Sequence, residues 1–158
     1  MTASSSEQAG ITPAIVRFTM AFILCVAVIY LITALLKFDI PGSMGIITLV
    51  VALAPAFDVF ARATGRVMAG GERLRFSASA AAIALLVNVA TLMIQAYLAF
   101  GSVSFGNLGA MLGLGRARLD LSIVAIGLAA GFVVAFLITY VSAGFMGRSA
   151  LKRLAKAK

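Results

Sequence analysis

Residues 121–146 read LSIVAIGLAAGFVVAFLITYVSAGFM, a run without a single Asp, Glu, Lys or Arg. A helix needs about 20 consecutive apolar residues to cross the hydrocarbon core of a bilayer, so this run is long enough to span a membrane. Its apolar residues are continuous and lack the alternation that a strand of a membrane barrel would show. The stretch therefore predicts a transmembrane helix.

Three earlier runs are also long and predominantly apolar. Soluble domains are about half apolar and about a quarter charged, whereas this chain of 158 residues is 63% hydrophobic and 11% charged. The surplus of apolar side chains must face lipid. The sequence thus predicts an all-α integral membrane bundle of four transmembrane helices, forming a single membrane domain over residues 1–158. The first three helices are expected at Ile15 to Leu36 (15–36), Ser43 to Ala61 (43–61) and Ala78 to Phe100 (78–100), before 121–146.

The segments that connect these runs differ in charge. Residues 62–77 form a basic loop, residues 101–120 a glycine-rich loop with Asp120 placed to cap the last helix, and residues 147–158 a basic tail. The polar residues 1–10 are expected to be a short flexible tail. If both termini are cytoplasmic, ten of the 13 Lys and Arg residues lie on the inner side, which is the distribution that the positive-inside rule favours.

The second run ends with a carboxylate, Asp58, that follows Pro55. Arg62 lies four residues later on the same helical face, and acid before base at this spacing is the favourable order for a helical pair. We expect an interfacial ion pair between Asp58 and Arg62 where the helix leaves the lipid. A proton or ion site at Asp58 is the alternative.

The third run carries a stripe of small and polar residues spaced four, three, four, three and four apart. This seven-residue period places them on one face and favours left-handed helix packing. The stripe is either packing contact inside the bundle or the wall of a polar cavity. Its members are Ser77, Ala81, Ala84 and the polar trio Asn88, Thr91 and Gln95.

The fourth run holds a ridge of small residues at Gly127, Gly131 and Ala135. Small residues four apart allow the backbones of two membrane helices to approach closely. The ridge predicts a close helix contact, either within the chain or with a partner.

The net charge of +8 suggests contact with anionic lipid headgroups and not with nucleic acid, because the basic residues lie in short segments between apolar runs. The GERLRFS stretch at 71–77 lacks the spacing and the lysine-serine ending of a phosphate-binding loop. It is expected to be a basic approach to the third helix. The expected headgroup contacts are Arg66, Arg73, Arg75, Lys152 and Arg153.

Candidate residues for catalysis are few. Histidine is absent, Cys25 is the only cysteine, and the five acidic residues form no cluster in the sequence. These absences remove the commonest general base and the usual groups of metal ligands. We therefore expect no catalytic, cofactor or metal site, and a protein that is not an enzyme.

The end of the second run, FDVFARATGR (57–66), and the GERLRFSASAA that follows (71–81) resemble a family of small four-helix bacterial membrane proteins, sometimes labelled ABZJ-type. The resemblance covers most of the chain. It implies a four-helix fold in the bacterial inner membrane, and it brings no activity or functional residues.

Two functions fit these observations. One is a non-enzymatic accessory or scaffold protein that packs against a larger membrane complex or self-associates. The other is a small transporter or channel component that uses the polar trio of the third run. An enzyme is a distant third, because no residues in the sequence group into a catalytic constellation.

Overall fold

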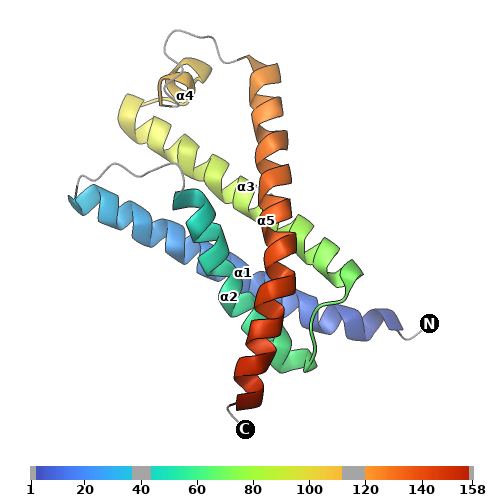
Figure 1. Ribbon diagram of the computed structural model, residues 1–158. Helices are drawn as coiled ribbons and strands as arrows, with labels where there is room; N and C mark the ends of the chain where they lie inside the picture. Colours follow the sequence, from blue (N-terminus) through green and yellow to red (C-terminus); the bar gives the residue numbers. More distant parts are fainter. Residues whose placement is uncertain (1–2, 37–43, 112–119, 157–158) are drawn as a thin grey trace. The chain divides into compact units, whose positions relative to one another are not determined.

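The computed structural model describes residues 3–36, 44–111 and 120–156 and is helical nearly throughout these ranges. The predicted all-α fold is confirmed, since four of the helices are long and apolar enough to cross a membrane. No strand occurs in the described ranges. The helices, labelled in Figure 1, are α1 (Ala3–Leu36), α2 (Met44–Thr64), α3 (Gly70–Phe100), α4 (Phe105–Met111) and α5 (Leu121–Lys156).

Two expectations about the segments outside the apolar runs are wrong. The helix α1 begins at Ala3, so the start of the chain is helical where a flexible tail was expected. The basic loop is also much shorter than residues 62–77, because α2 continues to Thr64 and α3 begins at Gly70. Hydropathy sets the limits of the lipid-spanning part only, and a helix extends beyond the lipid wherever each added residue gains a backbone hydrogen bond.

A glycine ends α2 and makes the turn to α3 short. Gly65 adopts a positive φ of 67°, and its N–H donates to the carbonyl of Ala61 at 2.9 Å. This left-handed residue just past the last turn is a common helix ending, because glycine has no Cβ to oppose it. The turn places Arg66 and the start of α3 within reach of each other.

The predicted glycine-rich loop 101–120 contains the short helix α4. Ser104 accepts the N–H of Asn107 at 3.2 Å and so caps the start of α4. Asp120 accepts the N–H of Leu121 at 2.7 Å, which confirms the predicted cap on α5. The middle of the loop, including Gly113 and Gly115, lies outside the described residues, as does the first connection 37–43.

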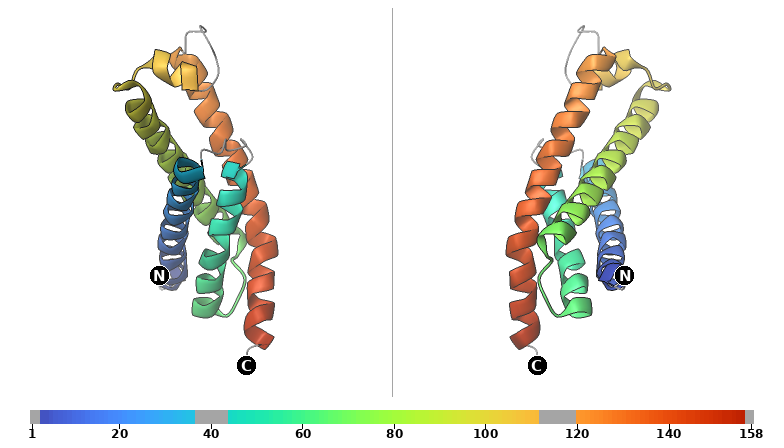
Figure 2. Two further views of the ribbon diagram at one scale, coloured as in Figure 1. Left: turned by 90° about the vertical axis from the view of Figure 1, so that its left-hand side faces the viewer. Right: turned by 90° about the vertical axis from the view of Figure 1, so that its right-hand side faces the viewer.

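The described helices belong to two compact units. Unit 1 comprises residues 1–84 and 135–158, and unit 2 comprises residues 85–134, so α3 and α5 each contribute to both. In unit 1, α1 and α2 pack along each other (Figure 2).

An aromatic cluster forms the core of unit 1. Phe18 and Phe22 of α1 stack with ring centroids 5.6 Å apart, and Phe76 of α3 lies 6.2 Å from Phe18 and 5.4 Å from Phe57 of α2. All four rings are buried. Aromatic pairs at such distances contribute about 0.5–1.5 kcal/mol each beyond the area that they bury. The cluster therefore joins α1, α2 and the beginning of α3 into one packed body.

The last part of α5 completes unit 1 through small side chains. Thr139, Ala143, Gly147 and Ala150 are its buried residues. A Cβ placed on Gly147 would lie 3.2 Å from Val67 Cγ1, which shows how closely the helix approaches the turn between α2 and α3. Small residues at this spacing are what close helix packing requires.

Candidate functional site

A buried carboxylate ties together the turn between α2 and α3. The side chain of Glu72 is 3% exposed, and its two oxygens accept hydrogen bonds from the Nη1 and Nη2 atoms of Arg66, each at 2.7 Å. Its Oε2 also accepts the N–H of Ala69 at 2.8 Å. This is the reach-back of an acidic residue to the residue before its helix, combined with a bidentate ion pair. We name this arrangement the Arg66–Glu72 clasp.

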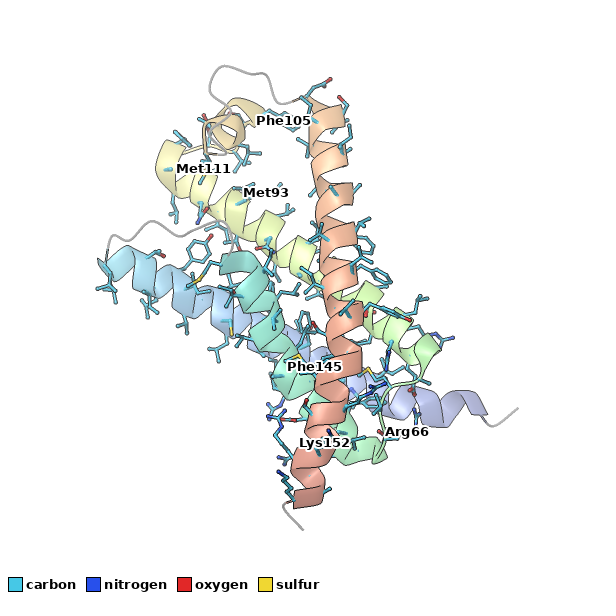
Figure 3. The ribbon with its side chains drawn as sticks, in the orientation of Figure 1. Arg66, Met93, Phe105, Met111, Phe145 and Lys152 are labelled. Carbon is cyan, nitrogen blue, oxygen red and sulfur yellow. The ribbon has the colours of Figure 1, made fainter. Side chains whose placement is uncertain are left out.

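The clasp also involves an aromatic ring of α2. The guanidinium carbon of Arg66 lies 5.8 Å from the centroid of Phe60, within the range of a cation–π contact. Figure 3 shows Arg66 in the segment between α2 and α3. Arg66 was expected to contact lipid headgroups, but the structure gives it Glu72 and Phe60 as partners within the protein. Its side chain is still 48% exposed, so one side remains open to the surroundings.

The partner of Asp58 differs from the expected one. Arg153 of α5 donates from Nη2 to Oδ1 of Asp58 at 3.2 Å, while Arg62 is exposed one turn along α2. Within the described residues, therefore, the Asp58 carboxylate pairs across helices and not with Arg62. The sequence spacing could not reveal this, because the end of α5 comes beside α2 only through the packing of unit 1. The pair is exposed, with side chains 62% and 38% accessible for Arg153 and Asp58, so it contributes little to stability.

Arg73 of α3 lies against a glycine of α5. A Cβ placed on Gly144 would be 3.2 Å from Nη1 of Arg73 and 3.5 Å from its Cζ. The absence of a side chain at Gly144 therefore makes room for the guanidinium. Two polar atoms in this region, Nε of Arg73 and Oγ of Ser77 one turn further along α3, are buried without a hydrogen-bond partner. Buried polar groups without a partner are energetically unfavourable.

The other basic residues expected at lipid headgroups lie on the outside of unit 1. Arg75, Lys152 and Arg153 are all exposed, and Figure 3 labels Lys152 near the end of α5. Long basic side chains in such positions can extend along apolar surface and keep their charge in water. These three residues are thus available for the predicted contacts.

The polar stripe on α3 divides between the two units. Ser77, Ala81 and Ala84 are buried in unit 1. In unit 2, Asn88 is exposed, whereas Thr91 and Gln95 are half-buried. The hydroxyl of Thr91 donates to the carbonyl of Val87 at 2.6 Å, so its hydrogen bond is made within its own helix.

The predicted small-residue ridge on α5 lies mostly in unit 2. Gly127 and Gly131 are exposed, and Ala135 is half-buried. A Cβ placed on Gly127 would meet no atom of another element within 4 Å, while one on Gly131 would be 3.7 Å from Cδ1 of Leu85. The ridge therefore makes one ordinary contact within unit 2, at Gly131. The tight approach of α5 occurs elsewhere, at Gly147.

The clasp is the feature that the sequence interpretation missed. Glu72 was expected in the basic loop 62–77, within the stretch GERLRFS that leads into the third helix. A usable signal was present, since a Glu three residues after Ala69 and just after a glycine turn is typical of a helix start. Its burial and its bond to Arg66 depend on the turn at Gly65, which hydropathy does not show.

The described residues offer no grouping for metal chemistry. No three His, Cys, Asp or Glu side chains come together among them.

A scan against protein-family models, a search of curated proteins and a search of solved structures found no match for this chain. Function must therefore be inferred from the chain's own residues.

Proposed function

We propose that this chain is a non-enzymatic accessory or scaffold protein of the bacterial inner membrane, which packs against a larger membrane complex and has both termini on the cytoplasmic side. The family that its second and third helices resemble is one of small four-helix proteins of that membrane. The orientation follows from the basic residues, which gather around the turn between α2 and α3 and at the end of α5.

The exposed ridge of α5 is the observation that carries this proposal. Gly127 and Gly131 are exposed in a helix that is apolar enough to span a membrane. Glycines four residues apart leave a shallow furrow, which lipid tails fill poorly and the backbone of another helix fills well. The same helix already uses small residues in this way at Ala143 and Gly147, which are buried in unit 1.

A leucine at Gly127 tests the proposal directly. An added Cβ at Gly127 would meet no atom within 4 Å, so we expect the fold to be retained while the approach of a partner helix is blocked. Ala129, also exposed but about opposite on the helix at 100° per residue, is the matched control. We expect the native complex extracted from its own cells in mild detergent to lose mass on a native gel with Gly127→Leu and to keep it with Ala129→Leu and Gly127→Ala. An unchanged complex with Gly127→Leu would contradict the proposed packing surface.

A small transporter or channel component is the second candidate. It is favoured by the exposure of Asn88 within an apolar span, on the same face as Thr91 and Gln95. Polar side chains in a membrane helix usually face a neighbouring helix or a water-filled path. Asn88→Leu with Gln95→Leu separates the two candidates. Loss of a solute flux with complex and fold intact supports transport, whereas loss of assembly alone supports the accessory role.

Lipid contact accompanies either function. We propose that Arg75, Lys152 and Arg153 contact the phosphates of anionic headgroups at the basic end of unit 1, with Arg66 and Arg73 contributing through their exposed edges. Each basic residue near an anionic surface contributes about 1 kcal/mol, and salt weakens the effect. No role for nucleic acid is proposed.

A further inference from the structure

Two adjoining hollows run along the surface between α1 and α2 in unit 1. The first, of about 240 Å³, is lined by Arg17 and Leu24 of α1 and by Pro55 of α2, among others. The second, of about 250 Å³, continues from Leu24 past Val28 and is closed on the α2 side by Val51 and its neighbours. Leu24 lines both hollows, so they adjoin, and we name the two together the α1–α2 groove.

The wall of the second hollow is hydrocarbon. Leu24, Val28, Ile47 and Val51 are exposed side chains of helices that are apolar enough to span a membrane. The hydroxyl of Thr48 in this wall donates to the carbonyl of Met44 at 2.8 Å, so it is satisfied within its own helix. The hollow therefore suits an apolar occupant that needs no hydrogen bond.

Arg17 gives the groove one charged end. It is exposed, and it lies within the span Gly10–Thr33 of α1. The carboxylates of Asp58 and Glu72 are bonded by Arg153 and Arg66, so among the described residues neither serves as its counter-ion. A guanidinium near hydrocarbon is stabilised by an anion, and its planar donors match the oxygens of a phosphate.

The length of the groove matches one lipid tail. From Arg17 to Ile29, which also lines the second hollow, α1 rises about 18 Å at 1.5 Å per residue. One leaflet contributes about 15 Å of hydrocarbon.

We propose that the α1–α2 groove binds one anionic phospholipid, with its phosphate on Arg17 and an acyl chain along Leu24, Val28 and Val51. The site is separate from the ridge of α5, and it requires only that the chain lies in a membrane. It is also distinct from the general headgroup contacts of Arg75 and Lys152, because it combines one cation with a shaped apolar wall. The prediction is a single lipid retained with defined stoichiometry.

Native mass spectrometry of the full-length protein, released from mild detergent with phosphatidylglycerol, tests the proposal. We expect one retained phosphatidylglycerol, with Arg17→Gln lowering the apparent affinity about tenfold through loss of the charge-assisted contact. Arg62→Gln is the matched control, since Arg62 is an exposed arginine of α2 outside the groove. Equal retention by the wild type and Arg17→Gln would overturn the proposal.

A second pair of variants tests the apolar wall while Arg17 stays in place. Val28→Phe fills the groove, whereas Val16→Phe adds the same bulk to α1 outside it, at similar exposures of 44% and 52%. Loss of lipid with Val28→Phe alone supports the site. Circular dichroism must show wild-type helicity for every variant compared. Retention of phosphatidylglycerol by a folded Val28→Phe protein would overturn the role of the groove.

A competition with inorganic phosphate distinguishes a site for free phosphate from a site for the phosphate of a lipid headgroup. We expect phosphate alone not to displace the lipid, because most of the binding comes from the acyl chain. Binding of free phosphate as tightly as phosphatidylglycerol, or a groove occupied by a second copy of the chain in place of lipid, would overturn the proposal. Weaker retention of phosphatidylcholine, whose headgroup carries no net charge, supports it.

Discussion

The two parts of α5 contain similar residues in different surroundings. In unit 1, Thr139, Ala143, Gly147 and Ala150 are buried and hold the helix close to its neighbours. In unit 2, Gly127 and Gly131 leave the helix surface open. Small residues about four apart thus occur twice in α5. In unit 1 they pack closely against other parts of the chain, and in unit 2 they make no such close contact. Under the proposed function, the part in unit 1 serves folding and the part in unit 2 serves association.

The Arg66–Glu72 clasp gives the largest expected effect, and it tests whether unit 1 is the stable part of the chain. Glu72→Ala should destabilise the fold by about 2–3 kcal/mol, because it removes the charge-assisted hydrogen bonds that Arg66 and the Ala69 N–H make to the buried carboxylate. Resistance to unfolding in mixed detergent and dodecyl sulfate, followed by circular dichroism, measures this. Glu72→Gln, which keeps an acceptor for Ala69 but loses the charge, should fall between the alanine variant and the wild type.

A change of less than about 0.5 kcal/mol with Glu72→Ala would contradict the structural role of the clasp. It would mean that apolar packing holds unit 1, through the aromatic cluster of Phe18, Phe57 and Phe76 and the small residues of α5. The clasp would then contribute little to the stability of unit 1. The contrast between the two parts of α5 would depend on apolar packing only.

A matched pair of glycine substitutions tests the comparison itself. Gly147→Leu should destabilise by about 1–3 kcal/mol, because the space next to Val67 is already filled and overpacking forces the helix away. Gly127→Leu should leave the stability of the isolated chain unchanged or raise it by up to about 1 kcal/mol, since leucine is the better helix former. The same unfolding assay measures both. Equal destabilisation by the two variants would remove the distinction between a packed and an open part of α5.

The sequence predicted the four spans because the need for long apolar helices in lipid is a local property of composition. It also predicted the cap at Asp120, which depends only on adjacent residues. It could not choose which small-residue row packs within the chain, because Gly127 and Gly147 both lie in rows that could face a neighbouring helix. In a membrane protein, lipid-facing and helix-facing surfaces are both apolar, so periodicity does not separate them as it does in a soluble protein.

The charged residues show the same limit more clearly. Acid and base four apart on one helix suggested that Asp58 pairs with Arg62, but the carboxylate bonds Arg153, distant in sequence. A pairing expected from spacing along one helix competes with pairings to charges that the fold brings near. Here the packing of α5 beside α2 decides between Arg62 and Arg153. The clasp was missed for a related reason, since a turn at Gly65 had to be known before Arg66 and Glu72 could be placed together.

The exposed pair of Asp58 and Arg153 gives the smallest expected effect. Asp58→Asn should lower stability by about 0.2–1 kcal/mol, because solvent screens an ion pair with side chains 38% and 62% accessible. High salt should reduce the difference further. Arg153→Gln should have a similar effect, and combining the two substitutions should add little, which a double-mutant cycle in the unfolding assay measures. If folded and correctly inserted Asp58→Asn protein loses its cellular function while Arg153→Gln keeps it, the carboxylate acts as a proton or ion site. Asp58 would then have a role beyond its pair with Arg153, and the end of α5 would not be part of that site.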